Sequence, residues 1–105
     1  MKELGKGGIQ RYLMDQVELY GGMAEHFTSP GKSGVPDLIV TWPAGFMAYP
    51  LTHYIETKSD IGTLKPWQTR DHKTRRSFGL HVEVIRTKPQ ADSYVKHYGV
   101  APART

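Results

Sequence analysis

The chain has no cysteine among its 105 residues. Disulfide bonds and thiolate metal sites are therefore excluded, which favours a reducing compartment and oxygen ligands for any metal. No stretch approaches the roughly 18–20 continuous apolar residues of a membrane span, and no signal peptide is evident at the N-terminus. We therefore expect a cytoplasmic protein with no membrane contact.

Acidic residues are also scarce relative to basic ones. The sequence has 10 Asp and Glu against 14 Lys and Arg, which gives a formal net charge of +4. Such a balance favours a polyanionic partner, because each phosphate that a cation neutralises releases counterions, although many small basic domains bind no nucleic acid. The length leaves room for a single domain spanning residues 1–105, with a core at about 8–98 and a modest stability that oligomerisation would help.

Two apolar runs carry acids that an ordinary core strand would not tolerate without partners. The first covers residues 34–40 and contains Asp37, and the second covers residues 54–58 and contains Glu56 and Lys58. Side chains two apart on a strand share a face, so Glu56 and Lys58 point the same way. If the two strands are neighbours, two carboxylates and an ammonium converge, which suits a hard divalent cation beside a phosphate. Taken singly, each run also fits a solvated edge strand or a turn.

Periodicity and turn residues predict the order helix, three strands, helix, strand, helix. Apolar residues at helical spacing favour a first helix, which two glycines end, and a last helix that Thr87 caps. Thr63 is a natural N-cap for the middle helix, where Pro66 is tolerated in the first turn. The expected elements are a helix at 8–20, strands at 23–28, 37–40 and 54–58, a helix at 64–78, a strand at 81–85, and a last helix carrying Ala91, Tyr94, Val95 and Tyr98.

The middle helix combines an apolar face with a basic one. Helical spacing predicts an inner face of Leu64, Trp67, Thr74 and Phe78, with Gln68, His72 and Arg75 on another face. Its cations follow the two acid-bearing runs directly, so we expect them to bind phosphate. Lys32 and Ser33 precede Asp37 in a loop that either touches a phosphate or is a plain surface turn. The predicted DNA-binding residues are Lys32, Ser33, Lys65, Arg70, His72, Lys73, Arg75 and Arg76.

Two further features are less specific. The five histidines show no paired helical or zinc-like spacing, so we expect none of them to be a metal ligand, and His53 has the strand parity opposite to Glu56. The segment 42–51 is more apolar than a solvated loop needs to be, with Trp42, Phe46, Met47 and Tyr49. It fits packing over the core or a dimer contact better than a wedge against DNA bases.

The motifs Gly34-x-Pro36-Asp37 and Glu56-Thr57-Lys58, followed by Gln68 in a helix, resemble the virus-type replication-repair nuclease (VRR-NUC) family of the PD-(D/E)XK nuclease superfamily. The resemblance covers residues 10–98 and includes an acid, Glu18, in the leading helix. It implies an α/β fold with a single-domain restriction-endonuclease-like core, a mixed central sheet flanked by helices in αβββαβα order.

The resemblance also implies an activity and a site. Asp37, Glu56 and the Thr57 carbonyl are expected to bind Mg²⁺ or Mn²⁺, with no small-molecule cofactor. Lys58 is expected to position or deprotonate the attacking water, and Gln68 to position the substrate. Glu18 is either an added metal ligand or an ordinary solvated acid.

Small members of the resembled family favour a homodimeric, Holliday-junction-resolving endonuclease of phage replication or repair, acting on branched DNA in the host cytoplasm. The alternatives are a monomeric flap or nicking nuclease and a catalytically silent DNA-binding module.

Overall fold

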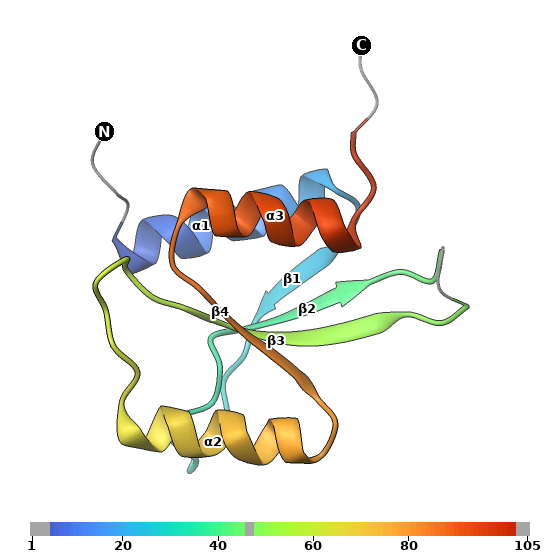
Figure 1. The fold of residues 1–105 in the computed structure, drawn as a ribbon. Coiled ribbons are helices and arrows are strands. Elements are labelled where there is room, and N and C mark those ends of the chain that lie inside the picture. Colours follow the sequence, from blue (N-terminus) through green and yellow to red (C-terminus); the bar gives the residue numbers. More distant parts are fainter. Residues whose placement is uncertain (1–4, 46–47, 103–105) are drawn as a thin grey trace.

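The protein folds as a four-stranded mixed sheet with helices on both faces (Figure 1). The computed structural model describes residues 5–45 and 48–102. The element order is αβββαβα, as the sequence predicts. The elements are α1 (Lys6–Leu19), β1 (Met23–His26), β2 (Leu38–Trp42), β3 (Leu51–Thr57), α2 (Pro66–Ser77), β4 (His81–Ile85) and α3 (Lys88–Tyr98).

The strands lie in the order β1-β2-β3-β4. The first three are antiparallel neighbours, and β3 and β4 are parallel, so the chain must cross from one end of the sheet to the other between them. Helix α2 makes this crossover on one face of the sheet, while α1 and α3 lie side by side on the other (Figure 1). One face of the sheet is therefore covered by α2 and the other by α1 and α3. Because alternate side chains of β3 point to opposite faces, neighbouring residues of this strand contact different helices.

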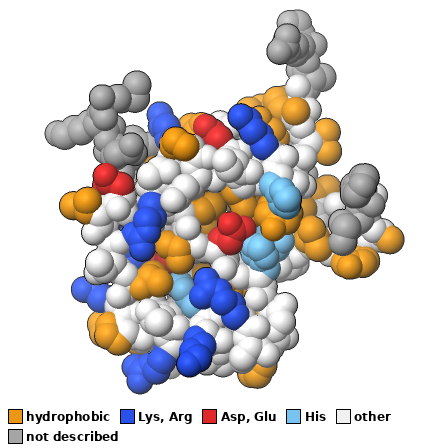
Figure 2. Space-filling model, viewed as in Figure 1, with side chains coloured by type: hydrophobic (Ala, Val, Ile, Leu, Met, Phe, Trp, Pro, Cys, Tyr) orange, Lys and Arg blue, Asp and Glu red, His pale blue; other side chains and the backbone are white. Residues whose placement is uncertain are grey.

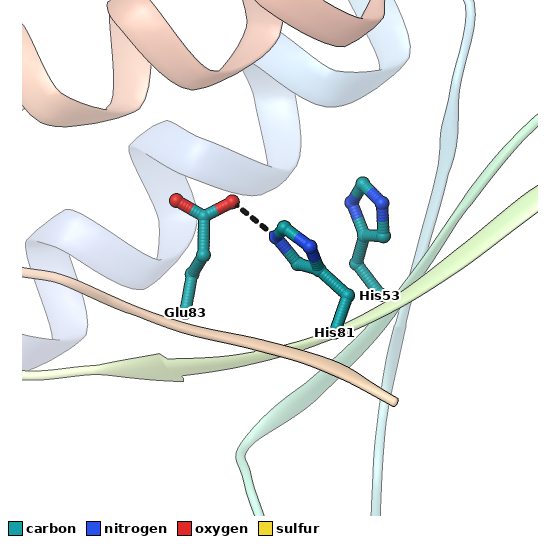
Figure 3. Close-up of side chains that lie close together, drawn as sticks. All are labelled: His53, His81 and Glu83. Carbon is teal, nitrogen blue, oxygen red and sulfur yellow. Dashed lines mark hydrogen bonds and ion pairs between the residues drawn. The ribbon is translucent and has the colours of Figure 1, made fainter. Parts of the chain in front are cut away.

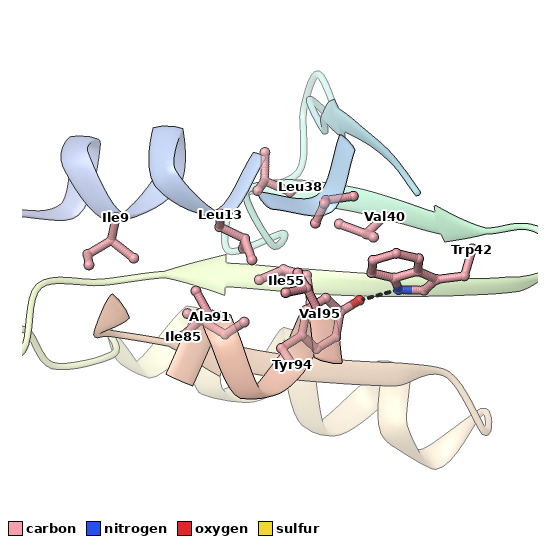
Figure 4. Packing of buried hydrophobic residues seen from close by; sticks show 11 residues of the cluster. Ile9, Leu13, Leu38, Val40, Trp42, Ile55, Ile85, Ala91, Tyr94 and Val95 are labelled. Atoms are coloured by element: carbon pink, nitrogen blue, oxygen red, sulfur yellow. Dashed lines mark hydrogen bonds between the residues drawn. The ribbon is translucent and has the colours of Figure 1, made fainter. Parts of the chain in front are cut away.

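The apolar core lies between the sheet and the pair α1 and α3 (Figure 4). The predicted helical stripe of Ile9, Leu13 and Val17 is fully buried, which confirms the periodicity of the first helix. In the last helix, the Thr87 hydroxyl accepts a hydrogen bond from the Gln90 N–H, as a capping residue does. The indole of Trp42 closes one end of the core and donates a hydrogen bond to Tyr94 Oη at 3.0 Å.

Helix α2 differs from the sequence prediction. Lys65 is its N-cap instead of Thr63, and its predicted apolar face is wrong, because Trp67 is 46% exposed and Phe78 is 76% exposed. The residues that α2 buries are Asp71 and His72. A polar inner face cannot be recognised by hydrophobic periodicity, and here it packs against the end of the sheet that carries the acids.

The segment 42–51 joins β2 to β3. Trp42 belongs to the core, while Tyr49 is 58% exposed. Phe46 and Met47, on which the predicted packing or dimer contact also rested, lie outside the described residues. Within the described ranges, no helix combines the length and apolarity that crossing a bilayer requires.

Candidate active site

The acids of the two motif runs meet where β2 begins and β3 ends. Leu38 pairs with Ile55 in the antiparallel register, so Asp37 lies beside the last residues of β3. Its Oδ2 accepts hydrogen bonds from the Thr57 N–H and from the Thr57 hydroxyl, both at 2.9 Å. The Glu56 side chain is fully buried next to it. The predicted convergence of Asp37, Glu56 and Thr57 is therefore present in the fold.

A cation occupies the centre of this cluster. The ammonium of Lys6, from the first turn of α1, donates to Asp37 Oδ2 at 2.8 Å, to Thr57 O at 2.9 Å and to Glu56 Oε2 at 3.3 Å. The ammonium contacts two carboxylates and a main-chain carbonyl, which are the hard oxygen ligands that a divalent cation such as Mg²⁺ prefers. Glu56 Oε1 is buried and lacks a hydrogen-bond partner. The three oxygen ligands and the unpaired Glu56 Oε1 would both suit a divalent ion with bound water at this position.

The surroundings of the two acids shift their pKa values in opposite directions. Burial, with the negative charge of Asp37, raises the pKa of Glu56. Burial also acts to raise the pKa of Asp37, but the hydrogen bonds from Lys6 and Thr57 outweigh it and lower that pKa. Burial opposes the charge on Lys6, yet its contacts with Asp37 and Glu56 hold its pKa above the usual value. The charges of Lys6 and Lys58 thus favour the ionised form of Glu56 against its burial.

Lys58 and Gln68 lie at the edge of the same cluster. Lys58 Nζ is 3.9 Å from Glu56 Oε2, which agrees with their shared strand face. Gln68 Oε1 accepts from the Lys65 N–H at 2.8 Å at the start of α2, and its Nε2 donates to Glu56 Oε2 at 3.2 Å. The cap therefore fixes the orientation of the amide and directs its donor to the acid.

His72 lies beneath the site instead of on the phosphate-facing surface that the sequence predicts. Its ring is fully buried, with Nε2 at 3.8 Å from Glu56 Oε1, and both ring nitrogens lack hydrogen-bond partners. Burial, with the nearby Arg76 and Arg75, lowers its pKa, so the ring is neutral at neutral pH. His72 is a buried neighbour of Glu56, and DNA cannot reach it in this conformation.

The remaining predicted DNA-binding residues are divided between a groove and the flank of α2. Lys32, Ser33 and Arg70 line one shallow groove. Arg75 is committed to protein contacts: its Nε donates to Asp71 at 2.7 Å, and its guanidinium lies over the rings of Phe27 and Tyr54. Figure 2 shows Lys and Arg side chains gathered over the part of this face where α2 lies. The exposed cations among the predicted set are Lys32, Lys65, Arg70, Lys73 and Arg76.

Glu18 is not brought to this cluster. It is exposed near the C-terminal end of α1, eight residues beyond Gln10, which corresponds to about 12 Å along a helix axis. The helix reaches the site through its first turns, where Gln10 Nε2 donates to the Thr57 hydroxyl at 3.2 Å. Lys6 and Gln10 were not predicted as site residues. Because they are four positions apart, they lie on the same face of the helix, and this spacing is the sequence feature that could have identified them as a pair.

The fold and the cluster of two acids, a lysine and a glutamine define an α/β nuclease. No family model matches the chain. The chain is 34% identical over 85 residues to “Putative nuclease p44” of Acyrthosiphon pisum secondary endosymbiont phage 1, across 81% of this chain and 84% of the phage protein. A solved structure titled “VRR_NUC domain” has a TM-score of 0.77 and 31% identity, covering 89% of this chain and 96% of that one. A second, titled “VRR_NUC domain protein”, has a TM-score of 0.67 and 22% identity, over 92% and 89% of the two chains, and shares the fold.

The chain belongs to the VRR-NUC family of nucleases. The family resemblance drawn from the sequence is therefore confirmed, and so is the mixed α/β architecture that it implied.

Proposed function

We propose that the protein is a divalent-metal-dependent endonuclease that hydrolyses DNA phosphodiester bonds. The observation that carries the proposal is the convergence of Asp37, Glu56 and the Thr57 carbonyl on one cation, within 2.8–3.3 Å of the Lys6 ammonium. These three groups would bind Mg²⁺ or Mn²⁺, and Lys6 would leave when they do. A bound divalent ion supplies a water of lowered pKa and neutralises charge on the phosphate.

The chain's own residues set the geometry around that ion. Asp37 is locked by two hydrogen bonds from Thr57, so its carboxylate is preorganised and its position does not depend on substrate. Glu56 is held by the Gln68 amide, which would turn to a phosphate oxygen or to the attacking water once the substrate is bound. The Lys58 side chain is 13% exposed, and its ammonium would stabilise the charge that develops on the phosphate.

The flank of α2 supports DNA as the substrate. The exposed cations Arg70 and Lys73 lie on the helix that also supplies Gln68, and the exposed Lys65 is its N-cap. A duplex held by that flank would bring its backbone to the acids. We do not assign His72 to this surface, because the ring is buried. Arg75 would act indirectly by fixing Asp71 beneath the groove.

We further propose branched DNA as the preferred substrate and a homodimer as the active form. The support is the family resemblance, in which small members resolve four-way junctions, and two-fold symmetry would place two sites on opposing strands. Flap or nick cleavage by a monomer is the competing form of the enzyme. The host cytoplasm is the proposed location if the gene is carried by a phage.

A catalytically silent DNA-binding module is the second candidate function. The observation that favours it is the Lys6 contact, since an ammonium bound by both acids satisfies them without a metal. Metal uptake separates the two candidates. A silent module would show no saturable Mn²⁺ binding that depends on Glu56.

The test is cleavage of a labelled four-way junction, a flap and a linear duplex in Mg²⁺ or Mn²⁺. We expect the wild-type protein to cut, and Glu56→Gln and Lys58→Ala to abolish the cutting while the far-ultraviolet circular dichroism is unchanged. Glu25→Gln, which alters an exposed acid on β1, is the matched control. Wild-type rates in Lys58→Ala would refute the catalytic assignment.

The same assay resolves the substrate. Paired symmetric cuts confined to the junction, together with a dimer in sedimentation equilibrium, would support the resolving enzyme. Cuts restricted to flaps would favour the monomeric alternative.

A further inference from the structure

A second cluster of metal-ligating side chains lies on the opposite face of the sheet from Glu56. It consists of His53 on β3 with His81 and Glu83 on β4 (Figure 3). One potential ligand atom from each residue lies within 4.8 Å of the other two. The imidazoles are stacked with centroids 4.0 Å apart, and His81 Nε2 is 2.6 Å from Glu83 Oε2.

The strand register explains why these residues meet although their spacing along the chain gave no sign of it. His53 pairs with His81 across the parallel strands, so the two side chains stand next to each other on one face. Glu83 is two positions further along β4 and has the same parity. All three side chains point toward the helices that cover this face (Figure 3). We expected no histidine ligand because we compared only spacings along the chain. Those spacings do not reveal that His53 and His81 pair across β3 and β4, which the α2 crossover separates in sequence.

The chemistry of this cluster differs from that of the nuclease site. Two imidazoles and a carboxylate favour zinc and its neighbours in the transition series, whereas Asp37, Glu56 and a carbonyl are hard oxygen ligands that favour magnesium. Neighbouring N and O ligands of a tetrahedral zinc ion lie roughly 3.3 Å apart, given metal–ligand bonds of about 2.0–2.1 Å. His81 Nε2 and Glu83 Oε2 are 2.6 Å apart, and the three ligand atoms all lie within 4.8 Å of one another, so small side-chain rotations would complete the site.

We propose that His53, His81 and Glu83 form a second metal site that takes a borderline transition-metal ion such as Zn²⁺. The ion replaces the proton shared by His81 Nε2 and Glu83 Oε2, and His53 Nε2 is the third ligand. A groove lined by Gln90, Ser93 and His97 adjoins the cluster and leaves a fourth position open to water.

The surroundings of His53 are those of a supported ligand. Its Nδ1 is 2.7 Å from Tyr94 Oη, which also accepts a hydrogen bond from Trp42 Nε1. When Nε2 binds an ion, Nδ1 carries the ring proton and donates it to Tyr94 Oη, the outer contact that fixes a metal-bound imidazole. Burial and the neighbouring His81 lower the pKa of His53 to about 4, so the ring is neutral at neutral pH.

Such an ion would join β3 to β4. These strands are separated in sequence by the whole crossover through α2, the helix that carries Gln68. Metal bonds across this pair would resist separation of the two strands. Binding to the native state would also raise the thermal midpoint, by an amount that grows with the logarithm of the free ion concentration once the site is largely occupied.

The experiment is titration of the full-length protein with Zn²⁺ in excess Mg²⁺, followed by calorimetry, and with Co²⁺, followed by visible absorption. We expect one Zn²⁺ per chain at this site and intense Co²⁺ bands typical of low coordination. His81→Ala and Glu83→Gln should each weaken binding at least about tenfold. His26→Ala, which removes an exposed histidine from β1 at the other edge of the sheet, is the matched control and should leave affinity unchanged.

Two results would overturn the site. One is the absence of saturable Zn²⁺ uptake by the wild-type protein. The other is uptake that persists in both His81→Ala and Glu83→Gln but disappears in Glu56→Gln, which would assign the ion to the carboxylate cluster. Because Glu83→Gln preserves side-chain shape on a partly exposed residue, loss of binding in that variant cannot be attributed to misfolding.

Discussion

Replacement of Lys6 by Ala should tighten metal binding at the nuclease site. The ammonium and the proposed metal ion require the same oxygens of Asp37, Glu56 and Thr57, so the ion would bind only to molecules in which Lys6 has been displaced. The apparent dissociation constant is the intrinsic constant divided by the fraction of molecules in that competent state, so the Lys6 contacts weaken the apparent affinity for the ion.

The size of the effect follows from the exposure of the partners. The Lys6 side chain is 44% exposed, and solvent screens most of its attraction to the carboxylates. A net stabilisation of about 1–2 kcal/mol for its three contacts is consistent with partly buried charged hydrogen bonds. That range corresponds to a factor of roughly 5–30, so Lys6→Ala should lower the apparent dissociation constant of Mn²⁺ by up to that factor.

Calorimetric titration of Mn²⁺ into wild type and Lys6→Ala measures the shift directly. Lys96→Ala removes an exposed lysine on α3 and controls for the change in net charge. In chelator, Lys6→Ala should have the lower thermal midpoint, because Asp37 and Glu56 then repel each other without a cation, and Mn²⁺ should reverse the order. Equal or weaker Mn²⁺ binding by Lys6→Ala would refute the competition.

Three further predictions test other parts of the molecule. Gly34 has φ +86°, and an added Cβ would lie 2.6 Å from the Trp67 carbonyl oxygen, so Gly34→Ala should lower the free energy of unfolding in urea by at least about 1–2 kcal/mol. The Tyr12 hydroxyl donates to Asp92 at 2.6 Å, which raises the pKa of Tyr12 to about 12. Tyr12→Phe should therefore cost about 0.5–1 kcal/mol at neutral pH. That difference should fade between pH 10 and 12, because the unfolded chain loses the phenolic proton first. Lys73→Ala should weaken DNA binding on all sequences alike and reduce the salt slope of the binding constant by about 1 in fluorescence anisotropy titrations.

Residue spacing along the chain correctly predicted which face of a helix is buried and which side chains of a strand share a face. The stripe of Ile9, Leu13 and Val17 identified the buried face of α1, because helical periodicity follows directly from the spacing of apolar residues. Strand parity likewise placed Glu56 and Lys58 on one side of β3 and His53 on the other.

The errors arose where tertiary contacts decide the outcome. Trp67 was wrongly predicted to lie on the buried face of α2. The helix instead buries Asp71 and His72 beneath the acids and leaves Trp67 exposed. Burial of a polar face has no periodic signature of its own. Lys6 was missed for a related reason, since its role depends on where the start of α1 lies relative to β3.

The antiparallel pairing of β2 and β3 separates two kinds of sequence change. The acids lie at the Leu38–Ile55 end of the pair, and the connection from Trp42 to Leu51 lies at the other, about 14 Å away along the strands. Changes in the length of that connection leave the acids opposite each other, so natural length variants or an inserted affinity tag should be tolerated there. A single inserted residue within β3 would instead turn Glu56 toward the core helices. Tolerance of insertions should therefore change abruptly along one hairpin, from the turn to the end that carries Asp37 and Glu56.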